Sequence, residues 1–276
     1  MGTSRRLAEV GAAATTLSTT LEEGVLWVVM GGPETANSMA RDAFAELGDL
    51  FDAVSMTDEV RVVVLRGGGR RFSTGGNVRR MAEQAETGGH EDRLAPDSSV
   101  RWLSRMYRNM LSMDQPVIAC VNGDAVGAGC TLALHCDIVL ASREARLGDP
   151  HVLRGLVASA GPYVWTTLTS LNIAKEYLLT GDLMPAEEAW RVGLVNHVYE
   201  PDELDAAARA LAAKLAAGAP RAVQWTKRVL NRMAMRQHVD LLGDGIAHEL
   251  LTFATEDHAE GAQAFLERRP PTFRGR

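Results

Sequence analysis

Two short apolar runs, at positions 62–65 and 117–121, constrain the fold more than any other feature of the sequence. Both runs are continuously apolar and rich in β-branched residues, so they lack the alternation that is typical of a strand with one face in water. They predict strands that are covered on both faces. Helical spacing precedes each run, at 39–54 and 100–113, and the sequence therefore predicts an α/β fold.

The patterns divide the chain into three parts. Residues 1–20 are rich in Ala, Thr and Ser without a periodic pattern, which predicts a disordered lead-in. Strand and helix signals alternate over residues 21–200, and only helical patterns follow over 201–276. We expect an α/β core followed by a helical C-terminal region. A polar, Gly-rich stretch at 85–99 is expected to be mobile.

Composition and charge exclude several classes of function. The chain has 276 residues, 46% of them hydrophobic and 23% charged, as in soluble globular proteins. Its net charge is -6 without a basic cluster, and its apolar runs are too short to span a membrane, so we expect neither a nucleic-acid nor a membrane partner. The cysteines at 120, 130 and 136 lack zinc-site spacing and predict buried thiols in the reducing cytoplasm.

Each buried strand is followed by a glycine-containing turn and the start of a helix, at 72–78 and 122–130. Glycine lets the backbone approach a ligand closely, and the start of a helix offers N–H donors without partners. Two such turns that face each other can bind one carbonyl oxygen as an oxyanion hole. The alternative is two ordinary strand-to-helix turns, and neither turn has the spacing of a dinucleotide or phosphate loop.

The motifs around these turns resemble those of the crotonase (enoyl-CoA hydratase/isomerase) superfamily, from about residue 21 to the C-terminus. Residues 71–77 (Arg-Phe-Ser-Thr-Gly-Gly-Asn) are similar to the family's G-x-x-F-S-A-G-x-D, and residues 116–123 (Pro-Val-Ile-Ala-Cys-Val-Asn-Gly) to its P-V-I-A-A-V-N-G. The resemblance implies a spiral of repeated ββα units with a C-terminal helical region that forms homotrimers or hexamers. It also implies an acyl-CoA ligand and no separate cofactor, because coenzyme A enters with the substrate.

By position in these motifs, the resemblance implies that the backbone N–H groups of Gly76 and Ala128 form the oxyanion hole. Arg79 either contacts the phosphates of coenzyme A or is a solvated helix cation. The residues that the resemblance places near the substrate are Thr74, Gly75, Asn77, Val78, Arg79, Thr131 and Ser159.

Both glutamates that position water in the family's hydratases are absent. Their positions hold Thr131 and His151, and Ser159-Ala160 occupies the position of an acidic base used by other members. Since each acid–base group contributes about 10²- to 10⁴-fold, the usual hydration is not expected. The usual isomerase chemistry is not expected either, unless another carboxylate enters the site. His151 is the remaining candidate for proton transfer, because imidazole titrates near neutral pH.

The segment around His151 also resembles a branch of the superfamily that hydrolyses carbon–carbon bonds of β-diketones. There a histidine works with an aspartate, whose position holds Ala160 here, and with a glutamate that matches Glu249. Three functions stay open: an enzyme that stabilises an acyl-CoA enolate, a non-catalytic acyl-CoA binding protein, and a β-diketone hydrolase. Single residues also have alternatives. The ring of His151 could instead form a hydrogen bond with a backbone carbonyl, and Glu249 could lie on a solvated face or form a salt bridge between subunits. We expect Asp149 to cap the turn that follows it.

Overall fold

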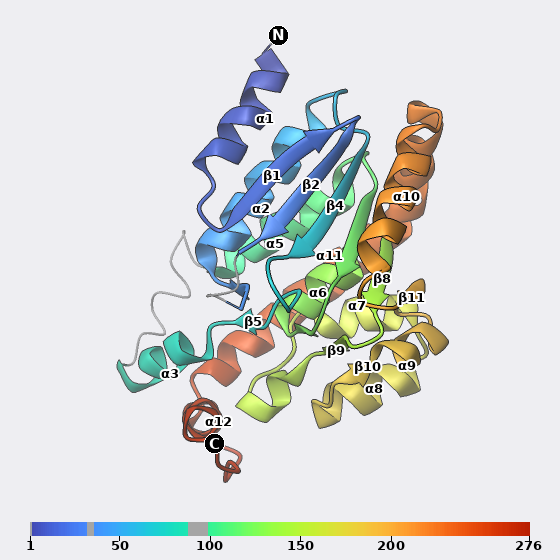
Figure 1. Ribbon diagram of the computed structural model, residues 1–276. Coiled ribbons are helices and arrows are strands. Elements are labelled where there is room, and N and C mark those ends of the chain that lie inside the picture. Colours follow the sequence, from blue (N-terminus) through green and yellow to red (C-terminus); the bar gives the residue numbers. More distant parts are fainter. Residues whose placement is uncertain (1, 32–35, 88–98) are drawn as a thin grey trace.

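The computed structural model describes residues 2–31, 36–87 and 99–276 and has a mixed α/β architecture (Figure 1). Within these residues, a six-stranded central sheet has the order β1-β2-β4-β6-β8-β11, with β1 antiparallel to β2 and all other neighbours parallel. Its strands are β1 (Leu17–Glu22), β2 (Val25–Met30), β4 (Val62–Gly67), β6 (Val117–Val121), β8 (Ile138–Ser142) and β11 (His197–Tyr199). The α-helices are α1 (Gly2–Ala13), α2 (Arg41–Ser55), α3 (Val78–Thr87), α5 (Ser99–Ser112), α6 (Ala128–His135), α7 (Gly161–Leu168), α8 (Leu171–Thr180), α9 (Ala186–Arg191), α10 (Leu204–Ala216), α11 (Pro220–Phe253) and α12 (Glu256–Glu267).

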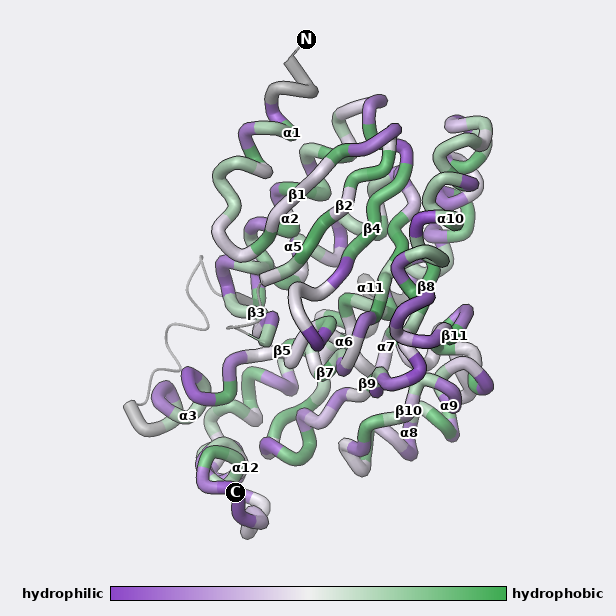
Figure 2. The backbone as a smooth tube through the Cα atoms, viewed as in Figure 1, coloured by the Kyte–Doolittle hydropathy of each residue, from purple (hydrophilic) through white to green (hydrophobic). Residues whose placement is uncertain are grey.

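Helices cover both faces of the central sheet, and alternate residues of β4 belong to two separate apolar clusters. Val63 and Leu65 pack in a cluster with side chains of α2 and α5. Val62 and Val64 pack in a second cluster with side chains of α10. This burial on both faces confirms the strand type that the continuous apolar runs predict, and Figure 2 shows β4 as a largely hydrophobic strand.

Short strands follow the strands of the central sheet and form a repeated strand–strand–helix unit. The units are β2-β3-α2, β4-β5-α3, β6-β7-α6 and β8-β9-η2, which agrees with the predicted ββα repeat. The short elements are β3 (Ser38–Met39), β5 (Gly75–Gly76), β7 (Ala125–Val126), β9 (Arg146–Gly148), β10 (Met184–Pro185) and the 3₁₀ helix η2 (Pro150–Arg154). Because β3 pairs with β5 and an isolated bridge joins Ser73 to Ala125, the two glycine-containing turns lie side by side.

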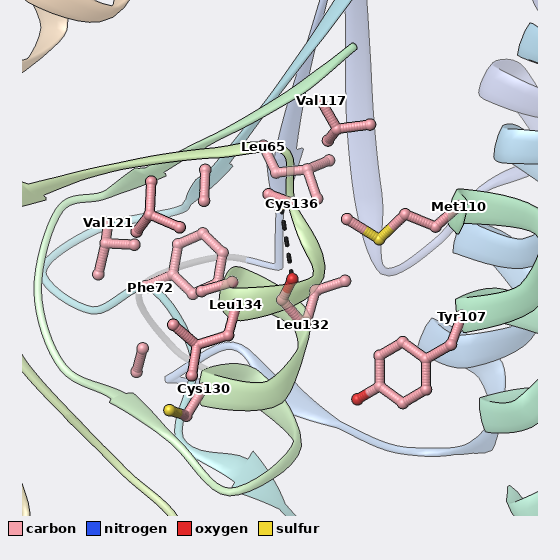
Figure 3. Packing of buried hydrophobic residues seen from close by; sticks show 14 of the residues in the cluster. Leu65, Phe72, Tyr107, Met110, Val117, Val121, Cys130, Leu132, Leu134 and Cys136 are labelled. Carbon is pink, nitrogen blue, oxygen red and sulfur yellow. Dashed lines mark hydrogen bonds between the residues drawn. The ribbon is translucent and has the colours of Figure 1, made fainter. Parts of the chain in front are cut away.

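The three cysteines are free and buried, as predicted. Figure 3 shows Cys130 and Cys136 among the apolar side chains of the core, with Leu65 and Phe72 nearby. The Cys136 thiol donates a hydrogen bond to the carbonyl oxygen of Leu132 at 3.5 Å. Burial raises the pKa of Cys130 and Cys136, so these thiols are packing residues.

The region after β11 is helical, as predicted. The long helix α11 packs against α5 and α7 (Figure 1). In the part of the chain that the structure describes, none of the helices combines the length and apolar character needed to cross a membrane.

The expected disordered lead-in at residues 1–20 is wrong for the residues that the structure describes, because they form α1 and most of β1. Leu7 and Leu17 are buried in the core, and Glu46 of α2 accepts hydrogen bonds from the backbone and hydroxyl groups of Thr15 and Thr16. These contacts order a segment that lacks a strong local pattern. Most of the stretch expected to be mobile, residues 88–98, lies outside the described residues, and 78–87 form α3. The division at residues 20 and 200 stays a prediction.

Candidate active site

A cavity of about 340 Å³ lies where the two glycine-containing turns meet α3, α5 and α11. Its wall combines apolar side chains of β3, α2, α3, α5 and α11 with polar groups of α3, α5, α6, η2, α11 and the segments beside them. The apolar lining includes Met39, Phe44, Met81, Leu103 and Phe253, and the polar lining includes Asn77, Arg80, Tyr107, Thr131, Asp149, His151, Ser159 and Glu249. An apolar pocket with a few convergent polar groups is typical of a ligand site.

The first turn reaches the cavity through Gly76. Gly75 has a positive φ of 74°, and a Cβ atom there would collide with the carbonyl oxygen of Val126, so glycine lets the two turns touch. Asn77 then caps α3, because its side-chain oxygen accepts the N–H of Arg80 at 3.1 Å. Gly76 is thereby fixed between a tight turn and a helix start, with its backbone in the cavity wall.

The second turn reaches the cavity through Ala128. Gly127 has a φ of 54° and precedes α6, and its N–H donates to the carbonyl oxygen of Gly148 at 2.8 Å. Ala128 is the first residue of α6, a position whose N–H has no acceptor within its own helix. A Cβ atom on Gly127 would lie 3.6 Å from Cε1 of His151, so the imidazole ring lies beside this turn.

His151 lies between two carboxylates. Its Nδ1 forms a short hydrogen bond with Oδ1 of Asp149, a residue that is only 2% exposed. Its Nε2 is 3.8 Å from Oε1 of Glu249, whose side chain is 11% exposed. The histidine side chain itself is 19% exposed and lines the cavity.

The two carboxylates determine the charge of this histidine. Burial lowers the pKa of His151, but the charge and hydrogen bond of Asp149 and the charge of Glu249 outweigh that effect, and the pKa rises to about 9 despite the nearby Arg154 cation. At neutral pH the ring is therefore an imidazolium. Its Nδ1–H is held by Asp149, and its Nε2–H is the proton available on the side of Glu249.

Thr131, which the resemblance places at one of the two glutamate positions, is buried in the cavity wall. Tyr107, contributed by α5, lines the cavity beside it and stacks on His135 with ring centroids 4.1 Å apart. Nδ1 of His135 donates to the carbonyl oxygen of Thr131 at 2.7 Å. Burial, and then the charge of Asp149, raise the pKa of Tyr107 well above its ordinary value, so it stays a neutral phenol.

The cavity brings together seven residues that the sequence analysis assigned to the site, and the others lie outside its wall. Those in the wall are Gly76, Asn77, Ala128, Thr131, His151, Ser159 and Glu249. Among the described residues, the wall does not include Thr74, Gly75, Val78 or Arg79. The Thr74 hydroxyl donates to the carbonyl oxygen of Ala36, and Arg80 takes the place in the wall that was expected for Arg79. The roles of these residues stay predictions.

The geometry corrects one single-residue expectation and disagrees with two of the alternatives that the sequence left open. Asp149 precedes η2 but its side chain does not cap that helix, because it contacts His151 instead. His151 therefore binds a carboxylate and not a backbone carbonyl. Glu249 is not solvated, because α11 turns it into the cavity. Asp149, expected only as a cap, and Tyr107 were not among the predicted site residues, and the one available signal was the Asp-Pro-His spacing at 149–151.

Comparison with known proteins shows similarity over almost the whole chain. The family described as enoyl-CoA hydratase/isomerase matches residues 20–276. The short-chain-enoyl-CoA hydratase of Clostridium acetobutylicum is 32% identical over 90% of this chain and 93% of its own length. The 2,3-dehydroadipyl-CoA hydratase of Escherichia coli is 32% identical over 92% of this chain and 97% of its own.

Solved structures give the same picture. The crystal structure of an enoyl-CoA hydratase/isomerase from Mycobacterium paratuberculosis is 34% identical, with a TM-score of 0.83 over 90% of this chain and 98% of that one. This similarity confirms the fold class that the sequence motifs imply.

Proposed function

Because the chain belongs to the enoyl-CoA hydratase/isomerase family of the crotonase superfamily, we propose that it adds water reversibly to the double bond of an enoyl-CoA thioester. The observation that carries this proposal is the row formed by Asp149, His151 and Glu249 beside the two oxyanion turns. The usual glutamate positions hold other residues, but Glu249 brings a carboxylate into the cavity from α11. The missing group therefore enters from another part of the fold.

The thioester oxygen binds between the backbone N–H groups of Gly76 and Ala128 in this proposal. Both residues lie in the cavity wall, and the turns that carry them touch at Gly75. Negative charge develops on this oxygen as water adds to the β carbon, and fixed N–H donors stabilise that charge. Such a donor contributes about 10²- to 10³-fold to the rate.

Glu249 and His151 supply the proton transfers. Their facing atoms are 3.8 Å apart, too far for a direct hydrogen bond but close enough for one water oxygen to lie about 2.8 Å from both. Glu249 takes a proton from this water as its oxygen bonds to the β carbon, and the electrons of the double bond move to the thioester oxygen. The imidazolium of His151 then gives its Nε2 proton to the α carbon, and Glu249 returns a proton to the ring.

The test uses two conservative variants and a panel of trans-2-enoyl-CoA thioesters. We expect His151→Gln and Glu249→Gln to lower kcat by about 10²- to 10⁴-fold. Calorimetry should show nearly unchanged affinity for a saturated acyl-CoA, since the oxyanion turns are intact. His248→Gln is the matched control, because His248 is exposed and neighbours Glu249 on α11. Turnover that is unchanged in His151→Gln would reject the proposed role, and turnover by the wild type would exclude a non-catalytic acyl-CoA carrier.

One observation favours a second reaction, hydrolysis of the carbon–carbon bond of a β-diketone. The aspartate that this chemistry requires is absent at Ala160, but Asp149 supplies a carboxylate to the same histidine. Water held by Glu249 would attack one ketone carbon, and His151 would protonate the carbon released. Two results together would favour this reaction over hydration. The protein would cleave a β-diketone, and calorimetry would detect no binding of coenzyme A thioesters.

The assembly and location of the protein complete the proposal. A homotrimer, or a hexamer built from two trimers, is what the family resemblance implies, and a cytoplasmic location follows from the unpaired cysteines. The proposed reaction needs no cofactor beyond the coenzyme A of the substrate.

A further inference from the structure

We infer that Gly161 is a positioning residue of the site, because the absence of a side chain there leaves the space in which the Asp149 carboxylate holds His151. The inference deepens the proposed function and rests on it, since it concerns the same histidine. Gly161 is the first residue of α7 and does not line the described cavity wall.

The carboxylate of Asp149 makes two different contacts. Its Oδ1 binds Nδ1 of His151, and its Oδ2 lies where a side chain on Gly161 would be. A Cβ atom built on Gly161 would be 2.5 Å from Oδ2, whereas ordinary contacts of this kind begin at 3.4 Å. The Oδ1 atom of Asp149 is held by His151, so a carboxylate that moves away from Gly161 cannot keep this hydrogen bond unchanged.

Backbone conformation does not explain a glycine at this position. The φ angle of Gly161 is not positive, so its backbone conformation is one that any L-residue can adopt. The other neighbours of the missing Cβ are the ends of Leu178 and Ala158, at 3.2 and 3.4 Å, which a small shift can relieve. The contact with Asp149 is therefore the one that excludes a side chain.

The start of α7 also suits a carboxylate electrostatically. Its N-cap residue, Ala160, has no side chain that can accept a hydrogen bond from the first turn, and the N-terminal end of a helix carries partial positive charge. The Asp149 carboxylate lies against the first residue of this helix, so the position of α7 limits where the group that holds His151 can lie.

Replacing Gly161 by alanine should push Asp149 away from its histidine. The groups that face His151 are Asp149 and Arg154 from its own segment and Glu249 from α11. With Asp149 displaced, the pKa of His151 should fall from about 9 towards 6.5. The kcat should fall by about 100-fold, the usual cost of misplacing a reacting group by about 1 Å, while KM changes little.

The decisive experiment is an NMR titration of the His151 ring proton in the full-length wild type and in Gly161→Ala, with the signal assigned by its loss in His151→Gln. Gly243→Ala is the matched control, because a Cβ atom on Gly243 would meet nothing within 4 Å. A His151 pKa that is equal in Gly161→Ala and in the control would overturn the inference. The titration needs no substrate, so a lowered pKa in a protein that hydrates no enoyl-CoA would reject the proposed function and leave this inference standing.

A double-mutant cycle separates positioning from a packing defect in α7. If Gly161 acts through Asp149, then Gly161→Ala should lower kcat in the wild type but not further in Asp149→Asn. Equal losses of kcat in both backgrounds would overturn the inference. If Gly161→Ala folds poorly, the double variant Gly161→Ala/Leu178→Ala takes its place. It removes the contact between the new methyl group and Leu178 but keeps the contact with Asp149, and the His151 ring is titrated in the same way.

Discussion

The charge on His151 depends on two residues that lie in very different places in the sequence. Asp149 is two residues away, and Glu249 comes from the far end of α11. Both stabilise the protonated ring, and their combined effect exceeds the opposing effect of burial. The histidine is thus prepared to give a proton at neutral pH rather than to accept one.

The raised pKa of His151 makes folding stability depend on pH in a defined direction. The ring titrates near 6.5 when unfolded and near 9 when folded, so its contribution to stability is complete below 6.5 and is lost as pH rises through 9. The free energy of unfolding of the wild type should therefore decrease, relative to that of His151→Gln, between about pH 6 and pH 10. Urea denaturation of both proteins across this range measures the difference. A difference that is constant with pH would show that the carboxylates do not hold the proton.

The sequence predicted part of this site, for physical reasons that can be stated. The two glycine-containing turns form a local pattern after buried strands, and the family resemblance singled out Gly76 and Ala128 within them. Both residues lie in the cavity wall, and their role as oxyanion donors stays a prediction. The Asp149 contact was not predictable, because an Asp-Pro-His segment is also a common turn, and only η2 directs both side chains inward. Tyr107 gave no signal, since an aromatic residue in a helix normally indicates core packing.

The elements themselves were largely predictable where burial is continuous. Strands β4 and β6 and helices α5 and α10 follow from apolar runs and periodicity in the sequence. The exception is the N-terminal segment, where α1 has few apolar residues and depends on α2 for its contacts. Tertiary contacts, including those of Glu46, determine that segment, and local patterns cannot report them.

An ion pair between buried Lys227 and the more exposed Asp137 joins helix α11 to the start of β8. Lys227 is 6% exposed, and its Nζ lies 2.7 Å from Oδ2 of Asp137 and donates to the carbonyl oxygen of Gln115 at 2.8 Å. Lys227→Met removes both contacts of the ammonium group and should destabilise the protein by about 1–3 kcal/mol. Urea denaturation measures the loss.

The double variant Lys227→Met/Asp137→Asn is the control, because it removes both charges. It should recover part of the lost stability, since no uncompensated charge remains. A single variant as stable as the wild type would show that the pair does not attach α11 to the sheet.

The cavity is lined by residues of the α/β core and of the C-terminal helix α11. Helices α1 and α12 lie at opposite ends of the molecule (Figure 1). The cavity wall is assembled from both parts, because the glycine-containing turns belong to the core and Glu249 belongs to α11. Correct docking of α11 is therefore a condition for the acid–base pair that we propose. Removing the C-terminal helices would leave the turns without Glu249.

The outer face of α11 bears on the predicted assembly. Trp225, Val229 and Met233 are spaced four residues apart and so lie on one face of the helix, and all three are exposed. An exposed apolar patch of this kind is more often a contact surface than a surface that faces only solvent.

We expect the wild type to be a trimer or a hexamer. Met233→Glu, at a side chain that is 75% exposed, should weaken the assembly without unfolding the chain. Light scattering after size-exclusion chromatography measures the mass, and Ala213→Glu on the exposed side of α10 controls for the added charge. A monomeric wild type, or a Met233→Glu protein of unchanged mass at all concentrations, would contradict the prediction.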